Sequence, residues 1–389
     1  MEHTWLLEFC KTDRQREVIA ALIEHKTQVK AAQALKIGER GLRKHIKRVK
    51  GYAANKAVAP EHGLDRQVPD GYKLKGFSDM RTNGEGKPIW YKVDADKERQ
   101  EEMMLEYIEY VTNDLKPIDL SYIAKPTQCD ADLVNFIPLT DTHIGDWAAA
   151  EITGEDWDLD IAKSLIPKVV GRAISQAPKA QTGVLALMGD IAHFDSALQA
   201  ETPHSRHHLD ASGTLQTIAP VIADILTHCI GLMLASYNNV VIPIIKGNHD
   251  PAATIWLKTF LPRLFANEPR VSFLTDNLEY QAMTFGKVMI GITHGDKIKP
   301  DSAPLVFASE FPKLWGDTEF REFHLGDKHH EATKSVKKGV KTYQHTTMGA
   351  RNRYPKGMGL SSDRELTVCT YHKDMGRVGT VTINAEMVR

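Results

Sequence analysis

Hydrophobic positions in the first fifty residues recur at helical spacing in three short segments. The first segment follows Thr12 and Gln15, which stand at the spacing of a helix capping box. The second begins at Thr27, and the third runs through residues 40–50 after a tight turn at Gly38, where we expect a positive φ. The apolar face of the third segment consists of Leu42, Ile46 and Val49. The pattern predicts three short helices.

The exposed side of the third predicted helix is basic, and no acidic residue occurs between positions 40 and 50. Its candidate DNA-binding side chains are Arg40, Arg43, Lys44, Lys47 and Arg48. Two helices joined by a turn, with the last one facing phosphates, form the layout of a helix-turn-helix domain. A solvated basic helix in a plain helical bundle is the alternative interpretation.

Residues 59–130 combine two patterns. A hairpin is predicted around Asn83-Gly84, which is a strong turn dipeptide, and a charged amphipathic helix is predicted over residues 97–115. We assign no chemistry to this segment and expect it to be a structural connector.

From residue 131 onward, apolar β-rich runs alternate with helical patterns, as in an α/β sheet whose two faces are covered. The longest apolar-rich stretch, residues 215–237, is interrupted by Pro220, Asp224 and His228. It is therefore predicted to be a buried amphipathic helix and not a membrane span.

Polar clusters follow five of the apolar runs, each just past the presumed end of a strand. In chain order they are Asp141-Thr142-His143, Asp190 with His193, Asn248-His249-Asp250, His294, and Asp327 with His329. The carboxyl ends of strands are where α/β sheets bind ligands. In Asp141-x-His143 the strand alternation would point both side chains the same way. Each cluster alone has an ordinary explanation as a turn or a core histidine, but the ordered set of five favours a binding site.

Composition narrows the class of protein. The chain has 389 residues, 42% of them hydrophobic, which suffices for two or three domains, and its net charge is −1. The cysteines form no CxxC pair, so we expect free thiols in a reducing cytoplasm. The N-terminus has an early acidic residue and no long apolar core, which argues against a signal peptide.

The candidate ligands are carboxylates, imidazoles and one carboxamide, with no thiolate. That mixture suits Mn²⁺, Fe or Zn²⁺ in a hydrolytic site and disfavours a structural zinc site. Two metals ~3.5–4 Å apart that share a carboxylate would clamp the attacking and leaving oxygens of a phosphate ester.

In order, the clusters resemble the motifs D-x-H, G-D, G-N-H-D/E, H and G-H-x-H of the calcineurin-like metallophosphoesterase superfamily, over about residues 135–332. The resemblance implies a β-sandwich flanked by helices, closed by a hairpin in residues 365–386. It also implies two metal sites that share Asp190. The first would use Asp141, His143, Asp190 and His329, and the second Asp190, Asn248, His294 and the residue at 327.

The departure from the family pattern is Asp327, which stands where the family has histidine. Aspartate still binds divalent cations through oxygen, and it favours a harder ion such as Mn²⁺. The alternatives are that His324 or His330 supplies the ligand, or that the second site is weak.

The stretches "GDIAHFDS" and "GNHD" differ from those of the superfamily's protein phosphatases. The spacing from Asp190 to His193 resembles the G-D-x-x-H of SbcD-type DNA repair nucleases. That resemblance implies that His193 protonates the leaving sugar oxygen and that His249 neutralises charge on the phosphate. The alternative for His193 is a plain helix-start or loop histidine.

The chain also resembles phage and prophage metallophosphoesterases that combine a helix-turn-helix with this catalytic domain. The residues that carry this resemblance are Thr202-Pro203 through His208-Leu209-Asp210, and Trp256-Leu257. It strengthens the helix-turn-helix interpretation.

We therefore predict an α/β metallophosphoesterase β-sandwich flanked by helices, preceded by a small all-α helix-turn-helix domain. The predicted domains are a DNA-binding domain in residues 1–58, a connector in 59–130 and the metallophosphoesterase domain in 131–389. The predicted function is hydrolysis of DNA phosphodiester bonds by a metal-activated water. Alternatives are a small-molecule or cyclic-nucleotide phosphodiesterase, and a DNA-binding protein whose site is inactive.

Two divalent ions are expected as cofactors, preferably Mn²⁺, with Fe, Zn²⁺ or Mg²⁺ as alternatives. DNA is the expected partner and no membrane is expected, while a homodimer and a further protein partner stay open. The expected location is the cytoplasm, in a bacterial host cell if the chain is phage-encoded.

Overall fold

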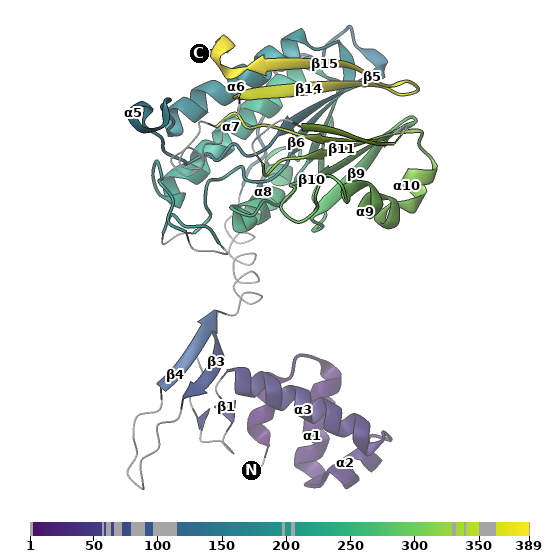
Figure 1. Cartoon of the computed structure of the whole chain (residues 1–389). Coiled ribbons are helices and arrows are strands. Elements are labelled where there is room, and N and C mark those ends of the chain that lie inside the picture. Colours follow the sequence, from purple (N-terminus) through teal and green to yellow (C-terminus); the bar gives the residue numbers. More distant parts are fainter. Residues whose placement is uncertain are drawn as a thin grey trace. The chain divides into compact units, whose positions relative to one another are not determined.

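The computed structural model describes the chain in two compact units, Met1–Tyr107 and Ile108–Arg389. Side chains are described for residues 3–54, 56, 115–196, 199–203, 207–328, 340–349 and 363–388, and short strands are described between 58 and 95 and at 332–337. Figure 1 shows the helices and strands of both units. The domain boundaries at residues 58 and 130 stay a prediction.

The first unit begins with a small helical bundle. Its helices are η1 (Thr4–Phe9), α1 (Asp13–His25), α2 (Gln28–Ala34) and α3 (Glu39–Asn55). The side chain of Thr12 caps α1 by accepting from the backbone N–H of Gln15, and Thr27 caps α2 in the same way from Lys30. Apolar side chains of all four helices, η1 included, share one core.

Helix α3 buries the predicted apolar face and exposes the predicted basic one. Leu42, Ile46 and Val49 are buried in the bundle core. The expected positive φ at Gly38 is wrong: its φ is −71°, because Gly38 is the extended N-cap residue of α3. The left-handed residue in this turn is Lys36, with φ +52°.

Among the described residues, four short strands follow the helical bundle, and the pair on either side of Asn83-Gly84 agrees with the predicted hairpin. They are β1 (Val58–Ala59), β2 (Leu64–Asp65), β3 (Tyr72–Ser78) and β4 (Trp90–Ala95). β3 and β4 pair antiparallel, with Tyr72 opposite Ala95. The turn at Asn83-Gly84 and the helix predicted after β4 lie outside the described residues.

The second unit is a sandwich of two sheets. The six-stranded sheet has the order β15-β14-β5-β6-β7-β8, and the five-stranded sheet has the order β12-β13-β11-β10-β9. The first consists of β5 (Asp130–Leu139), β6 (Ala180–Leu187), β7 (Asn239–Pro243), β8 (Val271–Leu274), β14 (Glu365–His372) and β15 (Gly376–Asn384). The second consists of β9 (Tyr280–Phe285), β10 (Val288–Thr293), β11 (Phe320–Leu325), β12 (Ala332–Lys337) and β13 (Val340–Gln344). β14 and β15 form the predicted C-terminal hairpin.

Strands β5 to β8 run parallel, as do β10, β11 and β13. Parallel strands need crossover connections. Helical segments supply them between β5 and β8 and between β10 and β11, whereas strand β12 lies in the connection from β11 to β13. The carboxyl ends of the strands in each parallel set therefore meet at one edge of its sheet.

Helices cover the outer face of each sheet, so the unit has helix, sheet, sheet and helix layers (Figure 1). Its helices are α5 (Ala150–Thr153), α6 (Leu159–Gln176), α7 (Leu215–Ser236), α8 (Pro251–Leu264), α9 (Ala303–Glu310), α10 (Pro312–Gly316) and η3 (Ala385–Val388). The buried side chains between the sheets are Val134, Phe136, Val184, Ala186, Met188, Ile245, Val288, Ile290, Ile292, Cys369 and Tyr371. The predicted fold class, an α/β sandwich flanked by helices and preceded by a helical region, is confirmed.

Among the described helices, α7 alone is long and apolar enough to cross a membrane by length and composition. Its side chains Ile218, Ile222 and Leu226 are fully buried in the core beneath the six-stranded sheet. It packs against α6 as a core helix, as its interruptions predicted.

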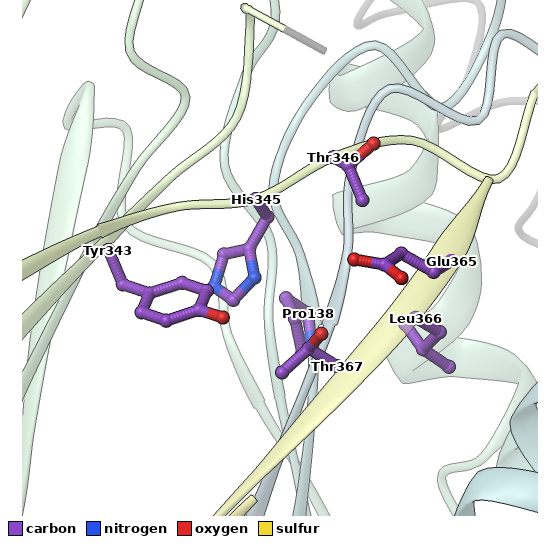
Figure 2. Close-up of a pocket in the computed structure, with 7 residues that line it drawn as sticks. All are labelled: Pro138, Tyr343, His345, Thr346, Glu365, Leu366 and Thr367. Atoms are coloured by element: carbon purple, nitrogen blue, oxygen red, sulfur yellow. The ribbon is translucent and has the colours of Figure 1, made fainter. Parts of the chain in front are cut away.

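A chain of buried polar groups crosses the sandwich core. His324 Nδ1 lies 2.8 Å from His345 Nε2, and His324 Nε2 lies 2.8 Å from the hydroxyl of Tyr371. That hydroxyl donates to Glu322 at 2.8 Å, so His324 Nε2 donates to the Tyr371 oxygen and Nδ1 accepts from His345. His345 and Tyr343 also border a small cavity (Figure 2). Because both ring nitrogens of His324 are engaged here, the alternative that His324 reaches the metal site is wrong.

Acid should destabilise the fold through this pair. Burial lowers the pKa of His345 to about 3 and puts the pKa of His324 well below its usual value. Both rings stay neutral in the fold while the unfolded chain takes up protons below about pH 6.5, so stability is full above that pH and falls below it. Urea unfolding of the chelator-treated protein gives the free energy of unfolding at pH 7.5 and at pH 5.5. The difference between these two free energies should be about 1.4 kcal/mol smaller in His345→Gln than in wild type. His207→Gln, at an exposed histidine, is the matched control, and an equal reduction there would contradict the assignment.

Candidate metal centre

The five predicted clusters follow the carboxyl ends of five strands drawn from both sheets. Asp141 follows β5, Asp190 follows β6, Asn248 follows β7, His294 follows β10 and Asp327 follows β11. Backbone hydrogen bonds join these loops, since Asp141 N–H donates to the carbonyl of Gly189, and Gly326 N–H donates to that of His294. The structure thus brings the described members of the predicted set together at one end of the sandwich.

Four candidate ligands have left-handed backbone conformations. Their φ values are +50° at Asp141, +41° at His143, +51° at Asp190 and +70° at Asp327. Non-glycine residues rarely adopt this region, and such strain concentrates at functional sites. The strand alternation that we expected for Asp141-x-His143 is therefore not what aims the two side chains. The chain leaves the strand first and turns sharply at both residues.

Asp190 stands between two imidazoles. Its Oδ2 lies 3.3 Å from His294 Nε2 and 3.9 Å from His143 Nε2. Its Oδ1 accepts the backbone N–H of His249 at 2.8 Å, which fixes the carboxylate plane. All three side chains are buried. One carboxylate oxygen between two imidazole nitrogens is the geometry that a shared ligand requires.

His294 presents Nε2 to the site because its Nδ1 donates to the carbonyl oxygen of Met188 at 2.9 Å. Asn248 Oδ1 lies 3.0 Å from the same Nε2. Burial opposes a positive charge on this ring, but Asp190, Asp141 and Asp327 outweigh it and raise the pKa of His294 well above its usual value. A divalent cation among these donors would relieve the same crowding of negative charge.

Asp250 holds the loops and does not face the candidate ions. Its carboxylate accepts four backbone N–H groups at 2.7 to 3.2 Å, from Asp190, Ile191, Ala192 and Gly247. Burial, followed by the charge of Asp190, raises the pKa of Asp250 to about 7. The sequence placed Asp250 in a cluster but gave no sign of this role, because three of these four partners lie about sixty positions away.

Asp327 lies near both His294 and Asp141, and its assignment to the second metal stays a prediction. A Cβ placed on Gly295, the neighbour of His294, would lie 3.5 Å from the Asp327 Cβ. The backbone N–H of Asp327 donates to the Asp141 carboxylate at 2.9 and 3.1 Å. The Nζ of Lys328 lies 2.6 Å from Asp327 Oδ2. The negative charge of the Asp327 carboxylate attracts the flexible ammonium group of Lys328.

Removal of the Asp327 carboxylate should weaken the binding of one ion and leave the binding of the other unchanged. Calorimetric Mn²⁺ titration of Asp327→Ala should show one ion bound as in wild type and the other roughly 10–100-fold more weakly, a loss taken from the range for disturbed metal sites. Lys328→Ala is the matched control, since it keeps the carboxylate and should retain both ions. Asp327→Ala with two ions at wild-type affinity would show that the carboxylate is not a ligand and leave His330 as the candidate.

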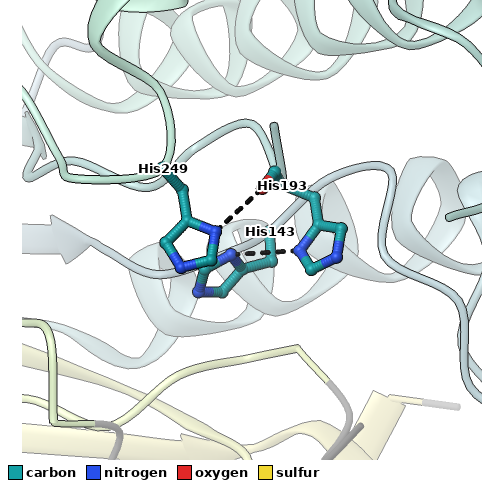
Figure 3. Close-up of side chains that lie close together, drawn as sticks. All are labelled: His143, His193 and His249. Atoms are coloured by element: carbon teal, nitrogen blue, oxygen red, sulfur yellow. Dashed lines mark hydrogen bonds between the residues drawn. The ribbon is translucent and has the colours of Figure 1, made fainter. Parts of the chain in front are cut away.

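Three histidines, His143, His193 and His249, lie close together (Figure 3). His193 Nδ1 is 3.4 Å from His143 Nδ1, and His249 Nδ1 donates to the carbonyl oxygen of His193 at 2.9 Å. Asp141, His143 and Asp190 form one group with ligand geometry, and the three histidines form another. Behind His193 lies Asp146, whose Oδ1 is 3.4 Å from His193 Nε2. The sequence motifs did not single out Asp146, although it follows the D-x-H motif by three residues.

Other predicted residues are placed differently or lie outside the described residues. His329 and His330 are among those not described, so the assignment of His329 stays a prediction. In the motif Trp256-Leu257, Leu257 is buried in the core, and Trp256 contacts Phe260 edge-on. The candidate DNA-binding residues of α3 belong to the first unit.

Comparison with known proteins gives structural similarities only. No family model matches the chain, and no curated protein matches it. Three similar solved structures are a dimetal phosphatase from Danio rerio, the phosphoesterase Yfce from E. coli, and a conserved uncharacterised protein from Streptococcus pneumoniae, itself predicted to be a phosphoesterase.

The Danio rerio protein is 11% identical, with a TM-score of 0.37 over 66% of this chain and 100% of that one. The E. coli protein is 13% identical, with a TM-score of 0.30 over 64% and 100%. The Streptococcus pneumoniae protein is 11% identical, with a TM-score of 0.27 over 66% and 99%. Because these sequence identities and TM-scores are low, the chemistry of this chain has to be inferred from its own side chains.

Proposed function

We propose that the chain is a dinuclear metal-dependent phosphodiesterase. The observation that carries the proposal is Asp190, whose Oδ2 lies between His143 Nε2 and His294 Nε2. The donors around it are oxygen and imidazole nitrogen, which suit Mn²⁺, Fe, Zn²⁺ or Mg²⁺ in a hydrolytic site. The resemblance of the ordered motifs to the calcineurin-like superfamily supports the same function.

Asp141, His143 and, from the sequence resemblance, His329 would hold one ion. Asn248, His294 and Asp327 would hold the other, and Asp190 would contact both. When bound, two divalent ions supply a nucleophilic water and neutralise charge on the phosphate oxygens. The chain's own contribution includes His249, whose Nδ1 is fixed by the His193 carbonyl oxygen. Its Nε2 is then the nitrogen left to meet a phosphate oxygen or a leaving group, and the ring is only partly buried.

DNA is the substrate that we favour, because α3 carries a basic surface. Arg40, Lys44, Lys47 and Arg48 are exposed. Arg43 is also exposed, but it forms an ion pair of 2.7 Å with Glu39, which reduces its availability for phosphates. The helix-turn-helix domain, Mn²⁺ as the physiological metal, the phage-type relationship and a cytoplasmic location belong to this proposal.

Two assays separate the candidate functions. Full-length protein with Mn²⁺ should cleave DNA oligonucleotides and also hydrolyse bis-4-nitrophenyl phosphate. Hydrolysis of the small diester without DNA cleavage would favour a small-molecule or cyclic-nucleotide phosphodiesterase. DNA binding with neither activity would favour a DNA-binding protein with an inactive site.

A further inference from the structure

We infer that Asp146 is a positioning residue that acts through His193 to hold the ring of His143 in its metal-binding orientation. His193 is then part of the support of the metal centre and not the acid that protonates the leaving group. The inference rests on the proposed metal-dependent function and adds roles that the sequence motifs did not provide.

The three side chains form a continuous buried row. Asp146 Oδ1 lies 3.4 Å from His193 Nε2, and His193 Nδ1 lies 3.4 Å from His143 Nδ1. The far nitrogen of His143, Nε2, faces Asp190 Oδ2 at 3.9 Å. Their residue exposures are 3% for Asp146, 1% for His193 and 7% for His143. Water therefore has little access to the row, and each polar group depends on its neighbours.

Matching the donors and acceptors in this row indicates which ring nitrogen of each histidine carries a proton. An imidazole that binds a metal through Nε2 carries its proton on Nδ1 and donates it to a partner that orients the ring. For His143 that partner is His193 Nδ1, which must then be an acceptor. The proton of neutral His193 consequently lies on Nε2, which faces the Asp146 carboxylate at 3.4 Å, an ion-pair distance longer than that of an ordinary hydrogen bond. The negative charge of Asp146 stabilises the proton at this nitrogen.

Asp146 is itself anchored in the loop that follows His143. Its backbone N–H donates to the carbonyl oxygen of His143 at 2.9 Å, and its Oδ1 accepts the N–H of Trp147 at 2.8 Å. The loops are also tied to each other, because the N–H of His193 donates to the carbonyl oxygen of Ile144. A carboxylate fixed in this way can select one tautomer of His193.

The expected general-acid role fits this geometry poorly. The nitrogen of His193 on the metal side would be occupied by the His143 proton, and the other nitrogen faces Asp146. His249, whose Nδ1 is satisfied by a carbonyl oxygen, keeps Nε2 for the substrate. The proton for the leaving oxygen would come from His249 or solvent.

Asp146→Asn in the full-length protein tests the inference, because the amide keeps the shape and removes the charge. Histidine-selective ¹⁵N NMR of the Zn²⁺-loaded protein should show His193 as the Nε2–H tautomer in wild type, with that population reduced in the variant. Calorimetry should give roughly 10–100-fold weaker Mn²⁺ binding at unchanged saturating stoichiometry. Asp146→Glu should restore part of the affinity, and Asp160→Asn, at an exposed carboxylate of α6, should match wild type in both measurements.

Leaving-group dependence distinguishes the two roles of His193. Loss of a general acid slows esters with poor alkoxide leaving groups far more than 4-nitrophenyl esters, whereas misplacement of His143 slows both by the same factor. In His193→Gln we expect equal losses on a 4-nitrophenyl diester and on a dinucleotide at saturating Mn²⁺. A selective loss on the dinucleotide, or a reduced number of bound ions, would overturn the inference. A wild-type protein that binds two ions but hydrolyses no diester would refute the proposed function alone, because the NMR and calorimetric results would stand.

Discussion

Asp190→Asn should bind neither ion tightly and should lose at least roughly 10³-fold in phosphodiester turnover. The shared carboxylate contributes to both sites, and several kcal/mol of charge stabilisation corresponds to that factor at about 1.4 kcal/mol per tenfold. The amide can still accept the N–H of His249, as Oδ1 does at 2.8 Å, so the loops should keep their fold. Metal analysis after reconstitution with Mn²⁺, together with bis-4-nitrophenyl phosphate turnover, measures both effects.

The matched control is Asp224→Asn, which neutralises an exposed carboxylate paired with Lys163 at 2.6 Å. It should retain both ions and wild-type turnover. An Asp190→Asn protein with full activity would show that this carboxylate does not bridge two ions. Loss of one ion alone would assign Asp190 to a single site.

Replacement of Lys44, Lys47 and Arg48 by alanine should weaken DNA binding and flatten its dependence on salt. If each side chain neutralises one phosphate, the slope of log affinity against log salt should fall by about 2.7, from about 0.9 per contact. Binding of a labelled duplex, measured by fluorescence anisotropy between 50 and 200 mM salt, gives the slope. Hydrolysis of a small diester should be retained, because these residues belong to the other compact unit.

A variant with Arg172, Lys179 and Lys313 changed to alanine removes the same charge from exposed positions of the second unit and serves as control. If both triple variants change the salt slope equally, the effect is one of net charge. If neither changes it, α3 is the solvated basic helix of a plain bundle.

Local patterns were enough to locate several helices and strands of the chain. The caps Thr12 and Thr27 and the apolar face of α3 depend on neighbours within one or two helical turns, so spacing alone predicts them. The positions of the candidate ligands were also local information, since a polar cluster after an apolar run indicates a strand end. The hairpin of β14 and β15 was expected from the family resemblance and not from local spacing.

The error at Gly38 shows where local inference stops. A glycine in a tight turn suggested a positive φ, but the tertiary path gave that conformation to Lys36 and used Gly38 as a helix cap. Composition tells which residues tolerate an unusual conformation, and the packing of α2 against α3 decides which residue adopts it.

The candidate ligands of the metal centre could be identified from sequence motifs alone. Which of them contact one another, and through which atoms, depends on the tertiary structure. That Asp250 holds four N–H groups, that Asp146 supports His193 and that His324 joins a separate core network all depend on contacts between residues distant along the chain or in different loops. Motif spacing specifies residue types, but proton positions and ring orientations follow from which donor faces which acceptor in the folded interior. Burial makes those contacts decisive, because a polar group without water must be satisfied by its neighbours.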